Sequence, residues 1–66
     1  VTDARVMALN ERERGLFEML ESQPRHIDDV LEESGLPMSI VSSTLMTLEI
    51  RGLVEQHPGQ LYSRAV

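Results

Sequence analysis

The four residues from Ser34 to Pro37 constrain the fold of this chain more than any other part of its sequence. Gly35 stands where a helix ends in a left-handed residue, and Pro37 suits the first turn of the next helix. The helix before this turn is expected to begin at Asp28, a good capping residue. The segment after it, 37–51, carries apolar residues at helical spacing, namely Met38, Val41, Leu45 and Leu48. Two helices joined by a tight turn that contains a glycine form a helix-turn-helix.

A third helix is predicted upstream, over residues 10–22. Asn10 and Glu13 have the spacing of a capping box, and an apolar face follows them. Gly15 costs about 1 kcal/mol relative to alanine inside a helix, which is tolerable if a neighbouring backbone packs closely there. Pro24 ends this helix, because proline disfavours helical backbone in the residue before it. The next three residues, 25–27, are expected to form one short strand.

A hairpin is predicted after the helix-turn-helix. Residues 53–56 and 61–64 read as short strands, and His57 to Gln60 join them. Pro58 and Gly59 occupy the central positions of a type II turn. The predicted fold is therefore mainly α with a small β-hairpin, a winged helix-turn-helix of three helices plus a wing over residues 10–66. Residues 1–9 show no sustained hydrophobic period. Because the sequence starts at Val1 without Met, we interpret these residues as the remnant of a linker in a longer chain.

Charge and size limit the functions open to this chain. The 66 residues carry 11 acidic and 6 basic side chains, and the formal net charge of −5 argues against a general electrostatic grip on nucleic acid. The absence of cysteine excludes a disulfide scaffold and most zinc sites. With no cysteine, a cytoplasmic location is the default expectation. No apolar run approaches the roughly 20 residues that a membrane helix needs.

Three segments carry a resemblance to a known family. They are LNERERGLFEML at the start, HIDDVLEESGLP in the middle and LMTLEIRGLVEQHPGQLYSR at the end. Together, from Leu9 to Arg64, they resemble the C-terminal winged-helix domain of the bacterial DNA-processing protein A (DprA, or Smf) family. The resemblance implies a parent protein that binds incoming single-stranded DNA in natural transformation and helps to load the RecA recombinase. It implies an accessory part for the winged helix itself, because the main single-strand site of that family lies in another domain.

The helix over 37–51 is the element that enters the major groove in DNA-binding relatives of this fold. Its hydroxyl groups can bond to phosphates or base edges, although an ordinary solvent-exposed face is the competing interpretation. On the wing, His57 and Gln60 lie at the tip, and Glu55 opposes the arginine of the return strand. The candidate DNA-contacting residues are Ser39, Ser42, Ser43, Thr47, Arg51 and Arg64.

A second set of residues on the same helix favours contact with protein. Ile40, Met46 and Ile50 lie beside the main apolar stripe and form a modest apolar patch if they are exposed, or pack under the wing or the N-terminal segment if they are not. We expect the partners to be other domains of the parent protein or a separate protein. A homodimer and weak DNA binding stay open, and no membrane partner is expected.

Nothing in the sequence supports catalysis or a cofactor. The two histidines, His26 and His57, are expected at a helix start and in a turn, without the spacing of metal ligands. Four acidic residues within 28–33 fit an exposed, capped helix better than a calcium loop. The sequence therefore predicts a non-catalytic accessory module of a DprA-like protein that acts mainly through protein contacts. The DNA-binding domain of a winged-helix transcription regulator is the alternative.

Overall fold

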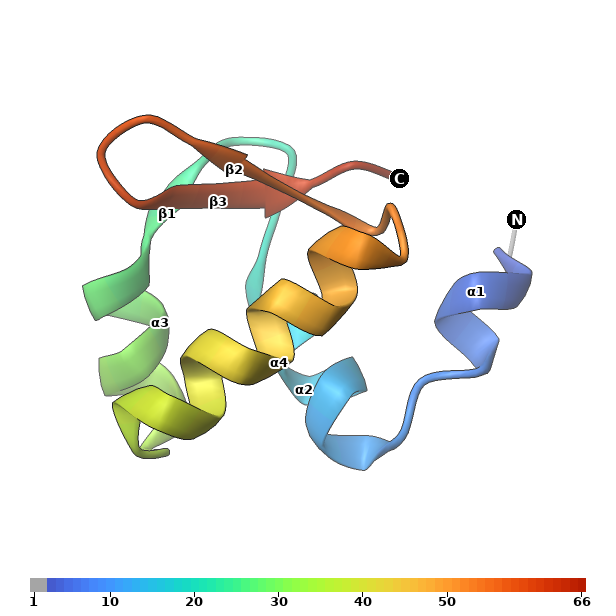
Figure 1. Cartoon of the computed structure of the whole chain (residues 1–66), viewed down its shortest axis with the longest axis horizontal. Helices are drawn as coiled ribbons and strands as arrows, with labels where there is room; N and C mark the ends of the chain where they lie inside the picture. The colour runs from blue at the N-terminus through green and yellow to red at the C-terminus, as the bar shows by residue number, and fades with distance from the viewer. Residues whose placement is uncertain (1–2) are drawn as a thin grey trace.

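Four helices and a three-stranded antiparallel sheet form the computed structural model, which describes residues 3–66 (Figure 1). Strand β3 is central in the sheet, with β1 and β2 on either side of it. The prediction of a winged helix is confirmed. The short strand expected at 25–27 covers only 25–26, because Ile27 starts a helix, and it joins the wing as a third strand. In chain order the elements are α1 (Ala4–Met7), α2 (Glu11–Met19), β1 (Arg25–His26), α3 (Ile27–Ser34), α4 (Met38–Ile50), β2 (Val54–His57) and β3 (Leu61–Arg64).

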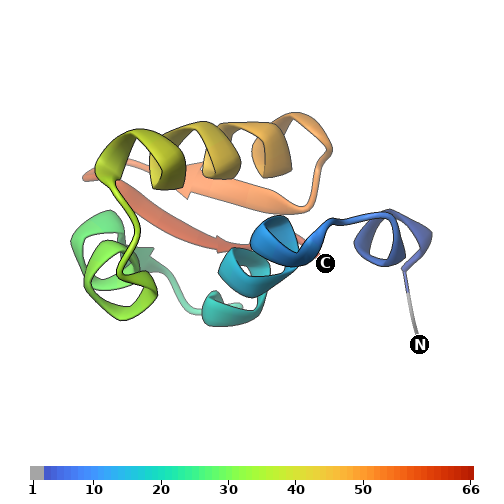
Figure 2. The same ribbon diagram turned by 90° about the horizontal axis from the view of Figure 1, so that it is seen from below.

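The core lies between the sheet and the three longer helices. In Figure 2, α4 runs along one side of the molecule, with the strands below it and with α2 and α3 on the opposite side. Leu45 of α4 and Leu53 of the following turn are fully buried at the centre. Burial of such side chains is the main stabilising contribution in a chain of this size. The core consists of Leu9, Leu16, Phe17, Leu20, Ile27, Val30, Val41, Leu45, Leu48, Leu53, Val54 and Tyr62.

Helix α2 begins as predicted and ends early. The Asn10 side chain accepts a hydrogen bond from the Glu13 N–H at 2.8 Å, and the Glu13 carboxylate accepts one from the Asn10 N–H at 3.1 Å. The predicted end at residue 22 is wrong, because the backbone leaves the helix at Leu20, which is completely buried. Tertiary packing of Leu20 thus ends the helix before the local signal at Pro24 takes effect.

Helix α3 is capped by His26 rather than by Asp28, so that prediction is wrong. The His26 Nδ1 atom accepts a hydrogen bond from the Asp28 N–H at 3.0 Å, and the helix starts at Ile27. The cause is the pairing of His26 with Leu61 in the sheet, which holds the backbone extended up to the start of the helix. Gly35 ends α3 with a φ of 69°, in the left-handed region that was expected.

Helix α4 buries Val41, Leu45 and Leu48 as the stripe predicts. Met38, the first member of the predicted stripe, is 44% exposed, whereas Thr44 is buried. Met38 is the first residue of α4, so its side chain lies at the end of the helix instead of over the core. The helix is followed by Gly52, whose φ of 77° allows the chain to turn back into the sheet.

The wing is a hairpin with a loop of three residues. Val54 pairs with Arg64 and His57 pairs with Leu61, which leaves 58–60 as the loop. Gly59 has a φ of 89°, as a type II turn requires, and Gln60 has a φ of 61°. A non-glycine residue in this region costs roughly 1 kcal/mol, and the sheet pairing on both sides of Gln60 holds it there.

Most of the segment that was assigned to a linker, residues 1–9, packs against the domain. Its first two residues lie outside the described ones, and the rest includes α1, capped by the Asp3 side chain, and the buried Leu9. One helical turn is too short for a hydrophobic period to indicate it. The Arg5 side chain of α1 donates hydrogen bonds to the backbone oxygens of Arg51 and Gly52, at 3.3 and 3.5 Å, so this segment contacts the end of α4.

Candidate functional site

The outer face of α4 is the surface on which most of the predicted site residues lie. Ser39, Ser43, Met46 and Ile50 are all exposed, and a helical step of about 100° per residue places them within about 60° of one another. Met46 and Ile50 are 58% and 79% exposed, so their burial under the wing or the N-terminal segment is excluded. Figure 2 shows this side of α4 clear of the other elements in the described part of the chain.

Two of the hydroxyl groups on this face bond to their own helix. The Ser43 Oγ atom donates to the backbone oxygen of Ile40 at 3.2 Å, and the Thr47 Oγ1 atom donates to that of Ser43 at 3.0 Å. Thr47 is also only half-exposed. Each hydroxyl has a single donor hydrogen, and here that hydrogen already bonds to the helix. Phosphate oxygens accept hydrogen bonds, so the remaining lone pairs of these two hydroxyls cannot bind them. Ser39 and Ser42 are exposed.

The predicted apolar patch divides into two parts. Met46 and Ile50 are one turn apart and adjacent. Ile40 lies about 120° around the helix axis from Met46 and is half-buried toward α2. Apart from Met38 at its first residue, the exposed apolar surface of α4 is therefore formed by Met46 and Ile50, with Ile40 on the flank.

The two candidate arginines are engaged within the domain. The Arg64 Nε and Nη2 atoms donate to the backbone oxygens of Phe17 and Glu18, at 3.2 and 3.3 Å, and its guanidinium lies 4.6 Å from the centre of the Phe17 ring. Arg51 pairs with Glu13 at 3.4 Å. Arg64 thus bonds to carbonyl groups in the last turn of α2, where the Phe17 oxygen also accepts the hydrogen bond of the Leu20 N–H.

Three further arginines make contacts of the same kind. The Arg14 side chain donates to the backbone oxygens of Val6 and Met7 at 3.3 and 3.5 Å, next to the end of α1. The Arg25 side chain donates to the backbone oxygen of Met19 at 2.8 Å and pairs with Glu33 at 2.9 Å.

Arg5 is the third of these arginines. It forms an ion pair with Asp3 and donates a hydrogen bond to the backbone oxygen of Arg51 at the end of α4. The hydrogen bond from Arg5 lowers the pKa of the Asp3 carboxyl. Among residues 3–66, only Arg12 of the six arginines lacks a hydrogen bond or an ion pair. Sequence reasoning missed this use of the arginines, because most of their partners are backbone oxygens.

The cleft between α4 and the wing is acidic. Glu49 and Glu55 both line it, together with Gln56 and His57, and none of its described lining residues is an arginine. His57 and Ser63 are hydrogen-bonded across the hairpin at 2.7 Å. Burial, with a smaller contribution from the Glu49 charge, raises the pKa of Tyr62. Duplex DNA bound in the usual winged-helix manner would bring phosphates close to these two carboxylates, which repel them.

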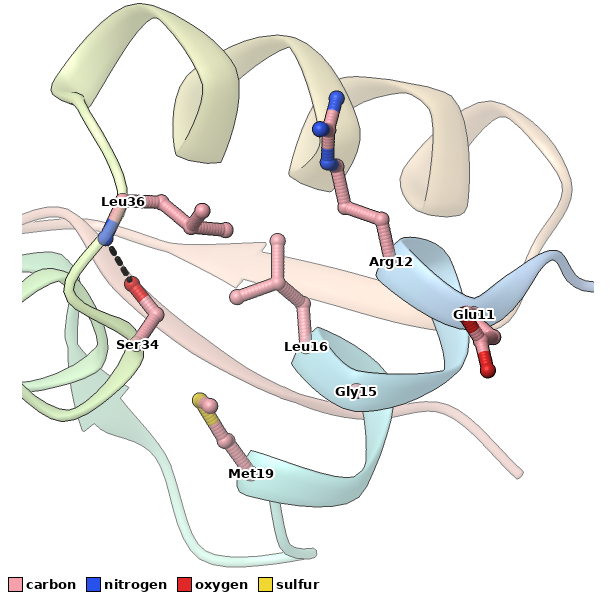
Figure 3. A pocket seen from close by; sticks show the side chains of 7 residues that line it. All are labelled: Glu11, Arg12, Gly15, Leu16, Met19, Ser34 and Leu36. Atoms are coloured by element: carbon pink, nitrogen blue, oxygen red, sulfur yellow. Dashed lines mark hydrogen bonds between the residues drawn. The ribbon is translucent and has the colours of Figure 1, made fainter.

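A shallow groove that sequence reasoning missed lies between α2 and the turn that leads into α4. Leu16, Met19 and Leu36 provide its apolar lining, and Arg12 lies at its edge (Figure 3). The Ser34 Oγ atom accepts a hydrogen bond from the Leu36 N–H at 3.2 Å on the same side. A Cβ atom at Gly15 would have no atom within 4 Å, so no close backbone contact accounts for the glycine at this position.

The remaining polar groups show no catalytic arrangement. Residues 3–66 contain no group of three or more potential metal ligands, and no helix among them is long and apolar enough to cross a membrane. His26 lies at a helix start, as expected, and His57 lies at the end of β2, beside the turn. The acidic residues of α3 are exposed, and Glu33 pairs with Arg25.

Comparison with known proteins gives one match. A family model described as the DprA winged helix domain matches residues 2–60. Searches of curated proteins and of solved structures found no significant match. The matched range runs from α1 to β2, so it includes the outer face of α4 and both carboxylates of the acidic cleft, Glu49 and Glu55.

Proposed function

The chain belongs to the DprA winged-helix domain family, and on that premise we propose that it is a non-catalytic accessory module of a DprA-like DNA-processing protein. It acts mainly through protein contacts and binds DNA weakly at most. The setting is the one that the resemblance implies, namely the handling of single-stranded DNA and the loading of RecA in the bacterial cytoplasm during natural transformation.

The observation that carries the proposal is the use of the arginines. Phosphate recognition needs cationic donors that are free to meet the backbone. Arg25, Arg51 and Arg64 would together give a salt slope of about −2.7 on duplex DNA if each neutralised a phosphate. All three already hold carbonyl or carboxylate oxygens. Arg12 is the one arginine among residues 3–66 without such a partner, so the expected slope is about −0.9.

DNA binding is tested by fluorescence anisotropy with labelled duplex and single-stranded oligonucleotides at low and at physiological salt. We expect no tight complex with either, and only a shallow dependence on salt. Sub-micromolar, sequence-selective binding that is lost in Arg51→Ala would contradict the proposal and favour the transcription regulator.

Protein contact is tested in the full-length parent protein with Met46→Glu and Ile50→Glu together. Both side chains are exposed, so these changes leave the fold intact. Loss of self-association or of partner binding supports the proposal. The matched control is Met7→Glu, which changes a methionine that is 64% exposed on α1 rather than on α4. Unchanged assembly and partner binding in the double variant would reject it.

A further inference from the structure

Four residues form a continuous line along the outer face of α4, which we call the α4 ridge: Ser39, Ser43, Met46 and Ile50. Their spacing of four, three and four residues is that of a heptad seam, on which two helices pack side by side. All four side chains are exposed and none is charged. The part of the chain that the structure describes leaves this seam without a partner helix (Figure 2).

Side-chain size along the α4 ridge follows a particular order. The first two positions are small serines and the last two are large apolar residues. Both the outer pair, 39 and 50, and the inner pair, 43 and 46, are centred on the point midway between Thr44 and Leu45. A two-fold axis through that point would set each large residue of one helix opposite a small residue of the other.

We propose that a second copy of this chain binds the α4 ridge, with the two α4 helices antiparallel. Ile50 of each copy packs against Ser39 of the other, and Met46 packs against Ser43. The contact is isologous, so the same four residues serve both sides. The proposal deepens the proposed function, on which it rests, by naming the protein that the outer face of α4 contacts.

Charge at the contact agrees with this pairing. Glu49 flanks the α4 ridge on the side of the wing, and the two-fold axis sets it between Met38 and Ser42 of the second copy instead of beside another carboxylate. Each copy has a formal charge of −5, so two copies repel each other at long range. Added salt screens this repulsion and strengthens the dimer, whereas it weakens a complex with DNA.

The size of the surface limits the strength of the contact. Four ridge residues with their flanks bury less than about 1,200 Å² in total, the range of weak and transient interfaces. We expect a dissociation constant on the order of 0.1–1 mM for the isolated chain. Such a contact becomes effective when a parent protein brings two copies together, because tethering raises the effective concentration.

The first experiment measures self-association by analytical ultracentrifugation and by dilution of the ¹⁵N-labelled chain. Ile50→Ser should weaken the dimer about tenfold or more, because each substitution acts twice in a two-fold contact. Adding Ser39→Ile to the same chain moves the isoleucine to the opposite end of the α4 ridge, where it faces the new serine of the second copy. This double variant should recover affinity to within about threefold of the natural chain.

The second experiment fixes the direction of the helices. The chain has no cysteine, so Ser39→Cys and Ile50→Cys introduce single thiols. In the antiparallel arrangement the mixed pair forms a disulfide, whereas two copies of the same variant hold their thiols about 16 Å apart along the axis. A parallel arrangement would instead cross-link each variant with itself.

The proposal is supported by mixed cross-linking, by recovery in the double variant and by tighter association at higher salt. It is overturned by a chain that stays monomeric at millimolar concentration, or by cross-linking within one variant only. The two levels of the account remain distinguishable. A monomeric chain whose parent still loses partner binding on Met46→Glu and Ile50→Glu refutes the second copy and keeps the protein-contact function.

Discussion

Removal of the Arg64 side chain should destabilise the domain, although arginine in a wing strand is commonly expected to serve DNA. Arg64→Ala removes two hydrogen bonds to the carbonyl groups of Phe17 and Glu18 and a guanidinium stacked 4.6 Å from the centre of the Phe17 ring. A net hydrogen bond contributes about 1 kcal/mol and the stacking about 0.5–1 kcal/mol. The free energy of unfolding should therefore fall by about 2–3 kcal/mol.

The measurement is urea-induced unfolding of the 66-residue chain, followed by circular dichroism. Arg12→Ala is the matched control, because Arg12 is exposed and has no partner among the described residues, and it should change stability by less than about 0.5 kcal/mol. Arg64→Lys should give an intermediate loss, since an ammonium group lacks the planar guanidinium fork. A loss in Arg64→Ala no greater than in Arg12→Ala would refute the structural role of this arginine.

Leu45→Ala should cost about 2–5 kcal/mol, because Leu45 is fully buried at the centre of the core; a loss below about 0.5 kcal/mol would mean that the buried face of α4 is misplaced. Gly15→Ala should raise the free energy of unfolding by about 0.5–1 kcal/mol, since a Cβ there has no atom within 4 Å; a loss in the same unfolding assay would show a steric need for glycine. Tyr62, the only tyrosine, has a pKa raised above its ordinary value of 10.0, mainly by burial. The folded state thus holds the Tyr62 proton more tightly than the unfolded state does. The resulting contribution to the free energy of unfolding is fully present below pH 10 and is lost as pH rises through the folded pKa. A titration of tyrosinate absorbance should show ionisation above that value, and ionisation at or below it would contradict the burial of the ring.

The helix starts and stops that were predicted correctly depend on contacts within a few residues. Asn10 caps α2 through Glu13, and Gly35 ends α3 through its own backbone freedom. The failures depend on residues far apart in the chain. Leu20 ends α2 early because it is drawn into the core, and His26 replaces Asp28 as a cap because the sheet fixes its backbone.

The candidate site shows the same division. The position of Met46 and Ile50 beside the buried stripe follows from a helical period, which a sequence displays directly, whereas the structure decides that they are exposed. The engagement of Arg64 with Phe17 spans 47 residues, and the acceptor is a backbone oxygen that every residue type provides. The acidic cleft likewise forms only when β2 folds back to bring Glu55 near Glu49. Composition predicts weak affinity for DNA, and the engagement of the arginines within the domain supports that proposal.

The most direct test of the central claim is a titration of the ¹⁵N-labelled chain with duplex DNA at low salt, read residue by residue. We predict small, unsaturated shifts, without a cluster on α4 at Ser39, Ser42, Ser43 and Thr47, because the cations of the domain already hold its own oxygens. Saturable shifts of those four amides at micromolar DNA, accompanied by changes in the side-chain signals of Arg51 and Arg64, would contradict the account.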